Sequence, residues 1–187
     1  SIGAHPSYPD LVGFGRRSMN CSAAEITALV AYQTSALGGM AQSMGISLDY
    51  VKPHGALYND MMANPRVRHA IMDAVAGFHL PIRLMLQATP EHPVHRAEAR
   101  ERGIELWFEA FADRAYDDEG KLLPRNLPGA VLEREPMLAQ VRQLNEQGTV
   151  TTVGGRILPL QADTLCVHGD NAQGVQAITA IRALLQA

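Results

Sequence analysis

Short apolar runs alternate along the chain with longer segments whose apolar residues recur at helical spacing. The runs that read as strands cover residues 1–5, 48–52, 82–88, 104–111, 149–153 and 163–168. The helices are expected to begin near Ser22, Pro65, Glu91, Glu135 and Asp170. Strands that alternate with helices favour parallel strands joined by right-handed crossovers. The pattern therefore predicts an α/β fold of the parallel β/α type.

Local signals define several of the helix ends. Ser22, followed three positions later by Glu25, forms a capping box, and Gly45 is expected to end the helix that Ser22 begins. Another helix is expected to begin with Pro65 at its first position, where a backbone N–H would have no partner within the helix. Asp170 is expected to cap the final helix, which is a routine position for aspartate.

Polar side chains follow the carboxyl ends of several predicted strands. These groups are His5, the pair Lys52 and His54, the segment 109–114, and the segment 168–170. In barrels and open sheets of parallel strands, binding sites form at that edge. We therefore expect the four groups to line one site.

Two of the groups lie in loops that contain histidine. In YVKPHGALYND, Lys52 and His54 are two strand positions apart, so both side chains can point the same way, and Gly55 lets the backbone turn or approach a ligand. In GAHPSYPD, His5 follows a strand and Asp10 lies on the same loop. A surface lysine, hydrogen-bonded histidines and a turn-capping aspartate also explain these residues.

The stretch FEAFADRAYDDEGKLLPR places charged residues at a strand end, where a solvated loop would not need them; they are Glu109, Asp113 and Arg114. Arg114 and Arg125 offer planar guanidinium groups that suit a carboxylate ligand. In CVHGDN, His168 follows an apolar run and is hard to explain by structure alone. The remaining histidines are expected to be solvated: His69, His79, His92 and His95.

Composition narrows the classes of function. With 187 residues, 47% hydrophobic and 19% charged, the chain fits one domain over residues 1–187 with a substantial core. The net charge of −3 and the scattered basic residues argue against nucleic-acid binding, and the apolar runs are too short to span a membrane. Two cysteines without a pairing pattern, and no signal peptide, favour a reducing, cytoplasmic location. Motifs for phosphate loops, dinucleotide binding, nucleophile elbows and CxxC pairs are missing.

Four motifs in this order, GAHPSYPD, VKPHGALYND, FADRAYDDEGKLLPR and VHGDN, resemble the LamB/YcsF family, also described as the A subunit of 5-oxoprolinase. The resemblance covers essentially the whole chain. It implies a seven-stranded β/α barrel of the glycoside hydrolase/deacetylase type. It also implies a role in the ATP-dependent opening of 5-oxoproline (pyroglutamate) to glutamate, together with partner subunits B and C.

The sequence also departs from the family pattern. Members normally begin with a strand of the form D-L-N-x-D-x-G-E and a second strand that ends in a motif like C-G-F-H-A-G-D, and this sequence starts after both. The barrel is therefore expected to be incomplete at its N-terminal side. Such a barrel would expose a strand edge, which favours association between copies of the chain.

The resemblance makes a ring-opening amidohydrolase subunit the leading hypothesis. Candidates for the general base are His5, His54 and His168, and Lys52 could stabilise an oxyanion or a phosphorylated intermediate. Arg114 or Arg125 would hold the substrate carboxylate. Further substrate-binding candidates are Asp10, Glu109, Asp113 and Asp170. ATP is expected to be handled with help from the partner subunits, because the chain has no nucleotide-binding motif of its own.

Two other hypotheses remain open. The fold type is shared with metal-dependent deacetylases, and His5, His54 and His168 are plausible ligands of a divalent ion, although no short H-x-x-x-H spacing supports this. Alternatively, the chain is a binding module or a catalytically inactive fragment.

Overall fold

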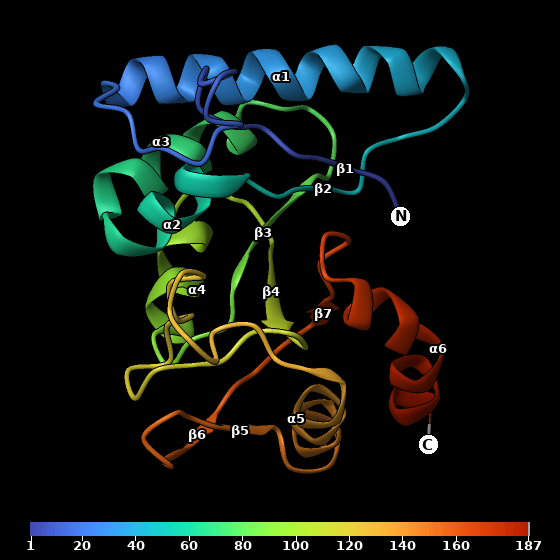
Figure 1. Ribbon diagram of the computed structural model, residues 1–187. Coiled ribbons are helices and arrows are strands. Elements are labelled where there is room, and N and C mark those ends of the chain that lie inside the picture. The colour runs from blue at the N-terminus through green and yellow to red at the C-terminus, as the bar shows by residue number, and fades with distance from the viewer. Residues whose placement is uncertain (187) are drawn as a thin grey trace. The chain divides into compact units, whose positions relative to one another are not determined.

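The computed structural model describes residues 1–186, and its helices and strands alternate along the chain (Figure 1). The helices are α1 (Ala23–Ser43), α2 (Gly55–Ala63), α3 (Pro65–Ala76), α4 (His92–Arg100), α5 (Arg134–Gln147) and α6 (Ala172–Gln186). The strands are β1 (Gly3–Ala4), β2 (Tyr50–Val51), β3 (Arg83–Gln87), β4 (Leu106–Phe111), β5 (Thr149–Thr151), β6 (Ile157–Pro159) and β7 (Thr164–Cys166).

Five strands form one parallel sheet in the order β1-β2-β3-β4-β7. The predicted class, an incomplete parallel β/α barrel, is therefore confirmed. The run at residues 149–153 does not join this sheet. It forms β5, which pairs antiparallel with β6 in a separate hairpin, and neither β6 nor α2 is among the elements that the sequence pattern predicts.

The chain divides into two compact units. The first unit comprises residues 1–86 and 93–107, and the second comprises residues 87–92 and the chain from residue 108 onward. The division falls inside β3 and β4, so each of these strands contributes residues to both units. The sequence-based expectation of a single domain stays a prediction.

In the first unit, α1 packs against α3. The capping box is present as predicted, because the Ser22 side chain accepts a hydrogen bond from the Glu25 backbone and the Glu25 carboxylate accepts one from the Ser22 N–H at 2.7 Å. Thr27 Oγ1 ties the two helices together by donating to the Ala70 carbonyl at 2.9 Å. Asn64 caps α3, and Pro65 occupies its first position as expected.

A buried ion pair joins α3 to α4 in the first unit. Arg68 donates to the Glu98 carboxylate at 2.7 and 2.9 Å, and it also donates to the Met61 carbonyl at 3.1 Å. The neighbouring His95 is only 1% exposed. The expectation that this histidine is solvated is wrong, because it lies on the face of α4 that packs inward.

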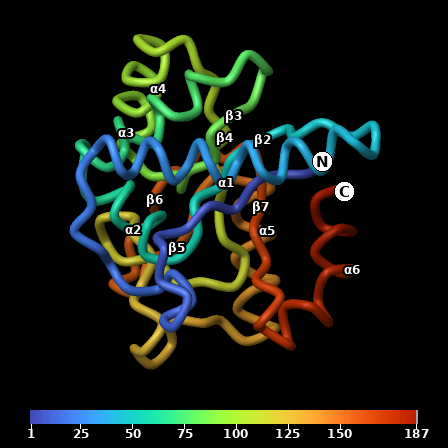
Figure 2. Tube along the Cα trace, turned by 90° about the horizontal axis from the view of Figure 1, so that it is seen from above, coloured from blue at the N-terminus to red at the C-terminus, as the bar shows by residue number. Residues whose placement is uncertain are grey.

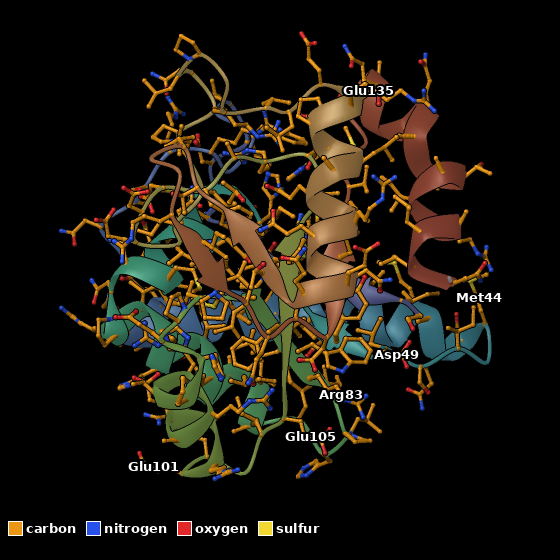
Figure 3. All side chains as sticks on the ribbon, turned by 90° about the horizontal axis from the view of Figure 1, so that it is seen from below. Met44, Asp49, Arg83, Glu101, Glu105 and Glu135 are labelled. Atoms are coloured by element: carbon orange, nitrogen blue, oxygen red, sulfur yellow. The ribbon has the colours of Figure 1, made fainter. Side chains whose placement is uncertain are left out.

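The amino-terminal side of β3 and β4 carries charges that satisfy one another. Arg83 pairs with Glu105 at 2.9 Å, as Figure 3 shows, and its guanidinium lies 5.0 Å from the centre of the Trp107 ring. These groups stabilise a strand end. This structural role distinguishes them from the polar residues that follow the carboxyl ends of the strands, which are candidates for the functional site.

In the second unit, α5 and α6 lie side by side (Figures 1 and 2). Their shared core contains Ala112, Met137, Val141, Ala177 and Ile181. The prediction that Asp170 caps α6 is wrong. The side chain that accepts from the first turn is Asn171, whose Oδ1 receives the Gly174 N–H at 3.2 Å.

Buried polar contacts fix the chain that leaves β4. Gln140 on α5 donates to the carbonyls of Phe111 and Arg114 at 2.8 and 2.9 Å, and the Tyr116 hydroxyl accepts the Phe111 N–H at 2.8 Å. Burial raises the pKa of Tyr116, so this hydroxyl stays protonated. The segment that carries Asp113 is therefore rigidly positioned.

Candidate functional site

Two clusters of candidate residues are formed, one in each unit. The first contains His5 and His54, called here the histidine pair. His54 Nδ1 lies 3.0 Å from His5 Nε2, and the two rings meet edge to face with centroids 4.8 Å apart. The outer nitrogens face backbone carbonyls: His5 Nδ1 lies 2.6 Å from the Lys52 oxygen, and His54 Nε2 lies 2.8 Å from the Phe14 oxygen.

The parallel pairing of β1 with β2 produces the histidine pair. Ala4 is opposite Val51 in the register, and the Lys52 N–H donates to the Ala4 carbonyl at 2.9 Å. One step further along, the His54 N–H donates to the Pro6 carbonyl at 2.8 Å. The residues that follow adjacent parallel strands therefore meet, as the sequence pattern predicts for this half of the site.

Counting protons shows what the histidine pair requires. Each carbonyl contact needs an N–H on the outer nitrogen, and two neutral imidazoles carry only two N–H groups between them. The two inner nitrogens then present lone pairs to each other at 3.0 Å. That arrangement is favourable only when a third proton or another cation lies between the rings. The pair therefore offers two nitrogen lone pairs to a proton or to another cation.

The donor set for a metal ion is small. Two imidazole nitrogens suit a divalent ion, but structural and catalytic zinc sites use at least three protein ligands. Within residues 1–186, no three His, Cys, Asp or Glu side chains are grouped around a common point. The involvement of His5, His54 and His168 in metal binding stays a prediction.

A tight loop over residues 10–17 supports the histidine pair. The Asp10 carboxylate accepts the Gly13 N–H at 2.9 Å and is held by the Arg17 guanidinium, whose Nε lies at 2.9 Å. This contact with Arg17 lowers the pKa of Asp10 to about 2. Phe14 adopts a left-handed backbone, with φ of 54°, and thereby directs its carbonyl at His54. Asp10 thus acts as the turn-capping residue considered above, and its substrate-binding role stays a prediction.

Gly55 is needed where α2 begins beside this loop. Its φ is 60°, and a Cβ there would collide with the carbonyl oxygen of Gly15. The Gly15 carbonyl instead accepts the Ala56 N–H at 2.9 Å. A chain that turns from β2 directly into α2 in this way holds His54 at the helix N-cap position.

The second cluster contains Asp113 and His168, called here the carboxylate–histidine pair. His168 Nδ1 lies 2.9 Å from Asp113 Oδ1, and the His168 backbone N–H also donates to Asp113, at 3.3 Å. The register of β4 and β7 explains the meeting, because Phe111 is opposite Cys166 and each partner follows two residues later. Asn171 Nδ2 donates to the same carboxylate at 3.3 Å.

The electrostatics of this pair suit a general base. Asp113 is 1% exposed, and burial would raise the pKa of its carboxyl group. The hydrogen bonds and charge of His168, with the bond from Asn171, outweigh burial and lower that pKa. When the His168 ring is neutral and its Nδ1–H donates to this carboxylate, the lone pair of the ring is on Nε2, where it can accept a proton. The ring itself is stacked on Phe111 with centroids 5.6 Å apart.

The charged residues near the carboxylate–histidine pair differ in their exposure to solvent. Arg114 is 7% exposed and donates through Nε to the Ala130 carbonyl at 3.2 Å and through Nη2 to the Leu123 carbonyl. Burial, and then the charge of Arg125, lower the pKa of Arg114. Its guanidinium therefore holds the loop after β4 together.

Arg125 is the accessible cation of this group. It is exposed and pairs with Asp170 at 3.0 Å, both side chains being open to solvent. Glu109 lies inside β4 and is 1% exposed. Of the residues proposed to hold a carboxylate substrate, Arg125 has the more suitable position. The sequence-based expectation that the four polar groups share one site stays a prediction.

An imidazole held by a buried carboxylate can act as a general base. The sequence matches the LamB/YcsF family over residues 1–187, and the chain belongs to this family. It is 50% identical to the A subunit of 5-oxoprolinase from Chromohalobacter salexigens, over 97% of this chain and 73% of that protein. It is 49% identical to the A subunit of 5-oxoprolinase from Vibrio cholerae, over 98% of this chain and 74% of that protein.

A solved structure supports the fold assignment. The crystal structure of the lactam utilization protein from Thermus thermophilus superposes with a TM-score of 0.87 at 37% identity, and covers 100% of this chain and 73% of that one. The resemblance to the LamB/YcsF family noted from the sequence motifs is therefore confirmed.

Proposed function

We propose that this chain is the A subunit of a 5-oxoprolinase and takes part in the ATP-dependent hydrolysis of 5-oxoproline to L-glutamate. The proposal is supported by the family, by relatives of that name at about half identity, and by a structural neighbour named for lactam utilization. The observation that carries the chemistry is the contact of 2.9 Å between Asp113 and His168.

Hydrolysis of a five-membered lactam breaks a resonance-stabilised C–N bond and therefore needs a base for the attacking water. His168 Nε2 removes a proton from the water as its oxygen bonds to the lactam carbonyl carbon. Asp113 holds the ring in the required tautomer and stabilises the imidazolium that forms. When the C–N bond breaks, His168 returns the proton to the ring nitrogen, which leaves as the free amine of glutamate.

Other residues have supporting roles in this proposal. Arg125 binds the carboxylate of 5-oxoproline, exchanging its present partner Asp170 for the substrate. Lys52 stabilises an oxyanion or a phosphorylated intermediate in the ATP-driven step. The chain carries no nucleotide-binding motif, so partner subunits B and C share the handling of ATP.

A reconstituted enzyme tests the proposal. The full-length protein is combined with subunits B and C, and glutamate formation from 5-oxoproline and ATP is measured. His168→Gln should reduce turnover about a hundredfold or more, because it removes the general base. The control is His79→Gln, which changes an exposed histidine of the first unit and should have no effect. Normal turnover of His168→Gln with an unchanged melting temperature would refute the assignment.

The histidine pair favours a second candidate, a metal-dependent hydrolase of the same barrel type. Its inner nitrogens lie 3.0 Å apart, and a divalent ion bound by both of them could use their lone pairs. Calorimetric titration of the full-length protein with zinc or magnesium decides this. Binding that disappears in His54→Ala would support the metal, and the absence of binding would remove the candidate.

We expect the protein to be located in the cytoplasm with its partner subunits.

No helix in the described part of the chain has the length and apolar character needed to cross a membrane. The alternative of a binding module would leave the carboxylate–histidine pair without a role.

A further inference from the structure

A pocket of about 270 Å³ lies in the first unit, on α2 and α3 and the segment that leads into α1. Its lining residues are Tyr8, Met19, Asn20, Cys21, Ile26, Asp60, Ala63, Asn64, Arg66 and Val67. Among the residues that the structure describes, the lining includes no candidate catalytic residue. The volume is slightly below the range of roughly 300 to 1,000 Å³ that drug-sized ligands occupy, so the pocket suits a small molecule.

One side of the pocket carries a carboxylate without a cation. Asp60 accepts the Tyr8 hydroxyl at 2.9 Å and the Ser18 hydroxyl at 3.0 Å. Burial and the neighbouring Asp60 raise the pKa of Tyr8, so the tyrosine stays neutral and acts as a hydrogen-bond donor to the Asp60 carboxylate. A carboxylate has about four lone-pair sites, and two hydroxyl donors leave capacity for a further donor that enters the pocket.

The pocket lining also includes a cation without a carboxylate partner. Arg66 is exposed at the second position of α3, and within residues 1–186 no ion pair joins its guanidinium to an acidic side chain. Ile26 and Val67 are buried side chains on the pocket wall. The pocket therefore presents one unpaired negative group, one unpaired positive group and an apolar wall.

We propose that this pocket binds a free α-amino acid. Asp60 and the two hydroxyls that it holds bind the ammonium group, Arg66 binds the carboxylate, and the ligand side chain lies against Ile26 and Val67. A zwitterion satisfies both charges at once, whereas a simple anion or cation leaves one charge of the pocket unpaired. This inference rests on the proposed function in one respect: the product of that reaction, L-glutamate, is an α-amino acid, whereas the lactam substrate has no ammonium group.

A ligand bound in the pocket would change the contacts that position the histidine pair. Tyr8 belongs to the loop that carries His5, and Asp60 lies on the helix that starts directly after His54. The bond between Tyr8 and Asp60, with that from the His54 N–H to the Pro6 carbonyl, joins this loop to α2. A ligand that draws the Asp60 carboxylate toward itself weakens this connection. The amino acid product should therefore inhibit the enzyme from a position outside the histidine pair.

Calorimetry on the full-length protein tests the binding step without ATP or partner subunits. L-Glutamate should bind, whereas N-acetyl-L-glutamate and 5-oxoproline, which lack the ammonium group, should not compete with it. Asp60→Asn should weaken L-glutamate binding at least about tenfold, because it removes the charge that the ammonium group needs while keeping the size of the side chain and one of its two acceptor oxygens. The matched control is Asp73→Asn, which changes a carboxylate on α3 that pairs with Arg102.

Two further variants separate binding from folding. Arg66→Gln changes an exposed side chain and should also weaken binding about tenfold without altering the melting temperature. Ala63→Phe leaves both charges in place but fills the pocket, and should abolish binding. If L-glutamate does not bind the full-length protein, or binds Asp60→Asn and Ala63→Phe as well as the unmodified protein, the amino-acid site is wrong. Because turnover is not measured, this result is independent of the proposed function.

Discussion

The histidine pair of the first unit and the carboxylate–histidine pair of the second unit use the same imidazole chemistry with different partners. In the first, backbone carbonyls take the outer N–H groups of His5 and His54, and the inner nitrogens lie 3.0 Å apart. In the second, the buried carboxylate of Asp113 takes the N–H of His168. Carbonyl partners leave the two inner nitrogens of the pair facing each other. A carboxylate partner instead leaves one nitrogen able to accept a proton.

This difference supports the proposed roles of the two pairs. A base must be able to take up a proton and become positive during the reaction, and Asp113 stabilises that charged state in His168. The inner nitrogens of His5 and His54 face each other, and their outer nitrogens face backbone carbonyls. We therefore propose that this pair stabilises negative charge, whereas His168 removes a proton from water.

The largest loss of turnover is expected when Asp113, the carboxylate partner of His168, is changed. Asp113→Asn should reduce turnover by on the order of a hundredfold to ten-thousandfold, because an amide can donate to Nδ1 and favour the wrong tautomer. Combining it with His168→Ala should cost little more than His168→Ala alone, since the two residues act as a unit. Fully additive losses in the reconstituted enzyme would mean that Asp113 acts separately from His168.

The sequence predicted that the polar groups after the strands line one site, and the two pairs that the structure shows arise for one physical reason. Residues that follow neighbouring parallel strands meet, and the registers of β1 with β2 and of β4 with β7 bring His5 to His54 and Asp113 to His168. The fold class, the capping box at Ser22 and the proline at the start of α3 were likewise readable from local patterns.

Other features depend on contacts that no local pattern encodes. The carbonyl of Phe14 reaches His54 only because a non-glycine residue adopts a left-handed conformation. Arg114 is directed into its own loop by the carbonyls of Ala130 and Leu123, although its sequence neighbours resemble a binding motif. The cap of α6 is Asn171 because Asp170 is drawn to Arg125, which is 45 positions away along the chain.

The next largest loss of turnover is expected from changes in the histidine pair and in the neighbouring Lys52. His54→Ala and Lys52→Ala should each reduce turnover about a hundredfold, as expected when a group that stabilises a developing negative charge is lost. Their effect on the free energy of unfolding should be small, about 0.5 kcal/mol for Lys52, because polar groups beyond a strand end contribute little to the core. Melting temperature and turnover are measured on the same samples. Normal turnover of His54→Ala would show that the KPHG segment is a structural turn.

A smaller effect should appear in the pH dependence of stability. The pKa of Asp113 is lowered in the folded protein, so its contribution to stability is present above the ordinary aspartate pKa of about 4 and is lost as the pH falls through the folded value. The difference in melting temperature between the unmodified protein and Asp113→Asn should therefore shrink below about pH 4. The histidine pair contains no carboxylate, so the difference for His54→Ala should not shrink in that range for this reason. A constant difference for Asp113→Asn would contradict the proposed partnership.

The smallest effect should come from Phe14, which supports the histidine pair through its backbone alone. A left-handed non-glycine residue costs on the order of 1 to 3 kcal/mol, and glycine adopts that conformation without the cost but loses more entropy on folding. Phe14→Gly should therefore change the free energy of unfolding by only about 1 kcal/mol and keep the carbonyl on His54, so turnover should be preserved. Phe14→Val, which disfavours the left-handed region, should lower both stability and turnover. Chemical denaturation and turnover of the two variants provide the measurement. If Phe14→Gly loses as much turnover as Phe14→Val, the ring of Phe14, which lies 5.1 Å from the His54 ring, rather than its carbonyl, is what His54 requires.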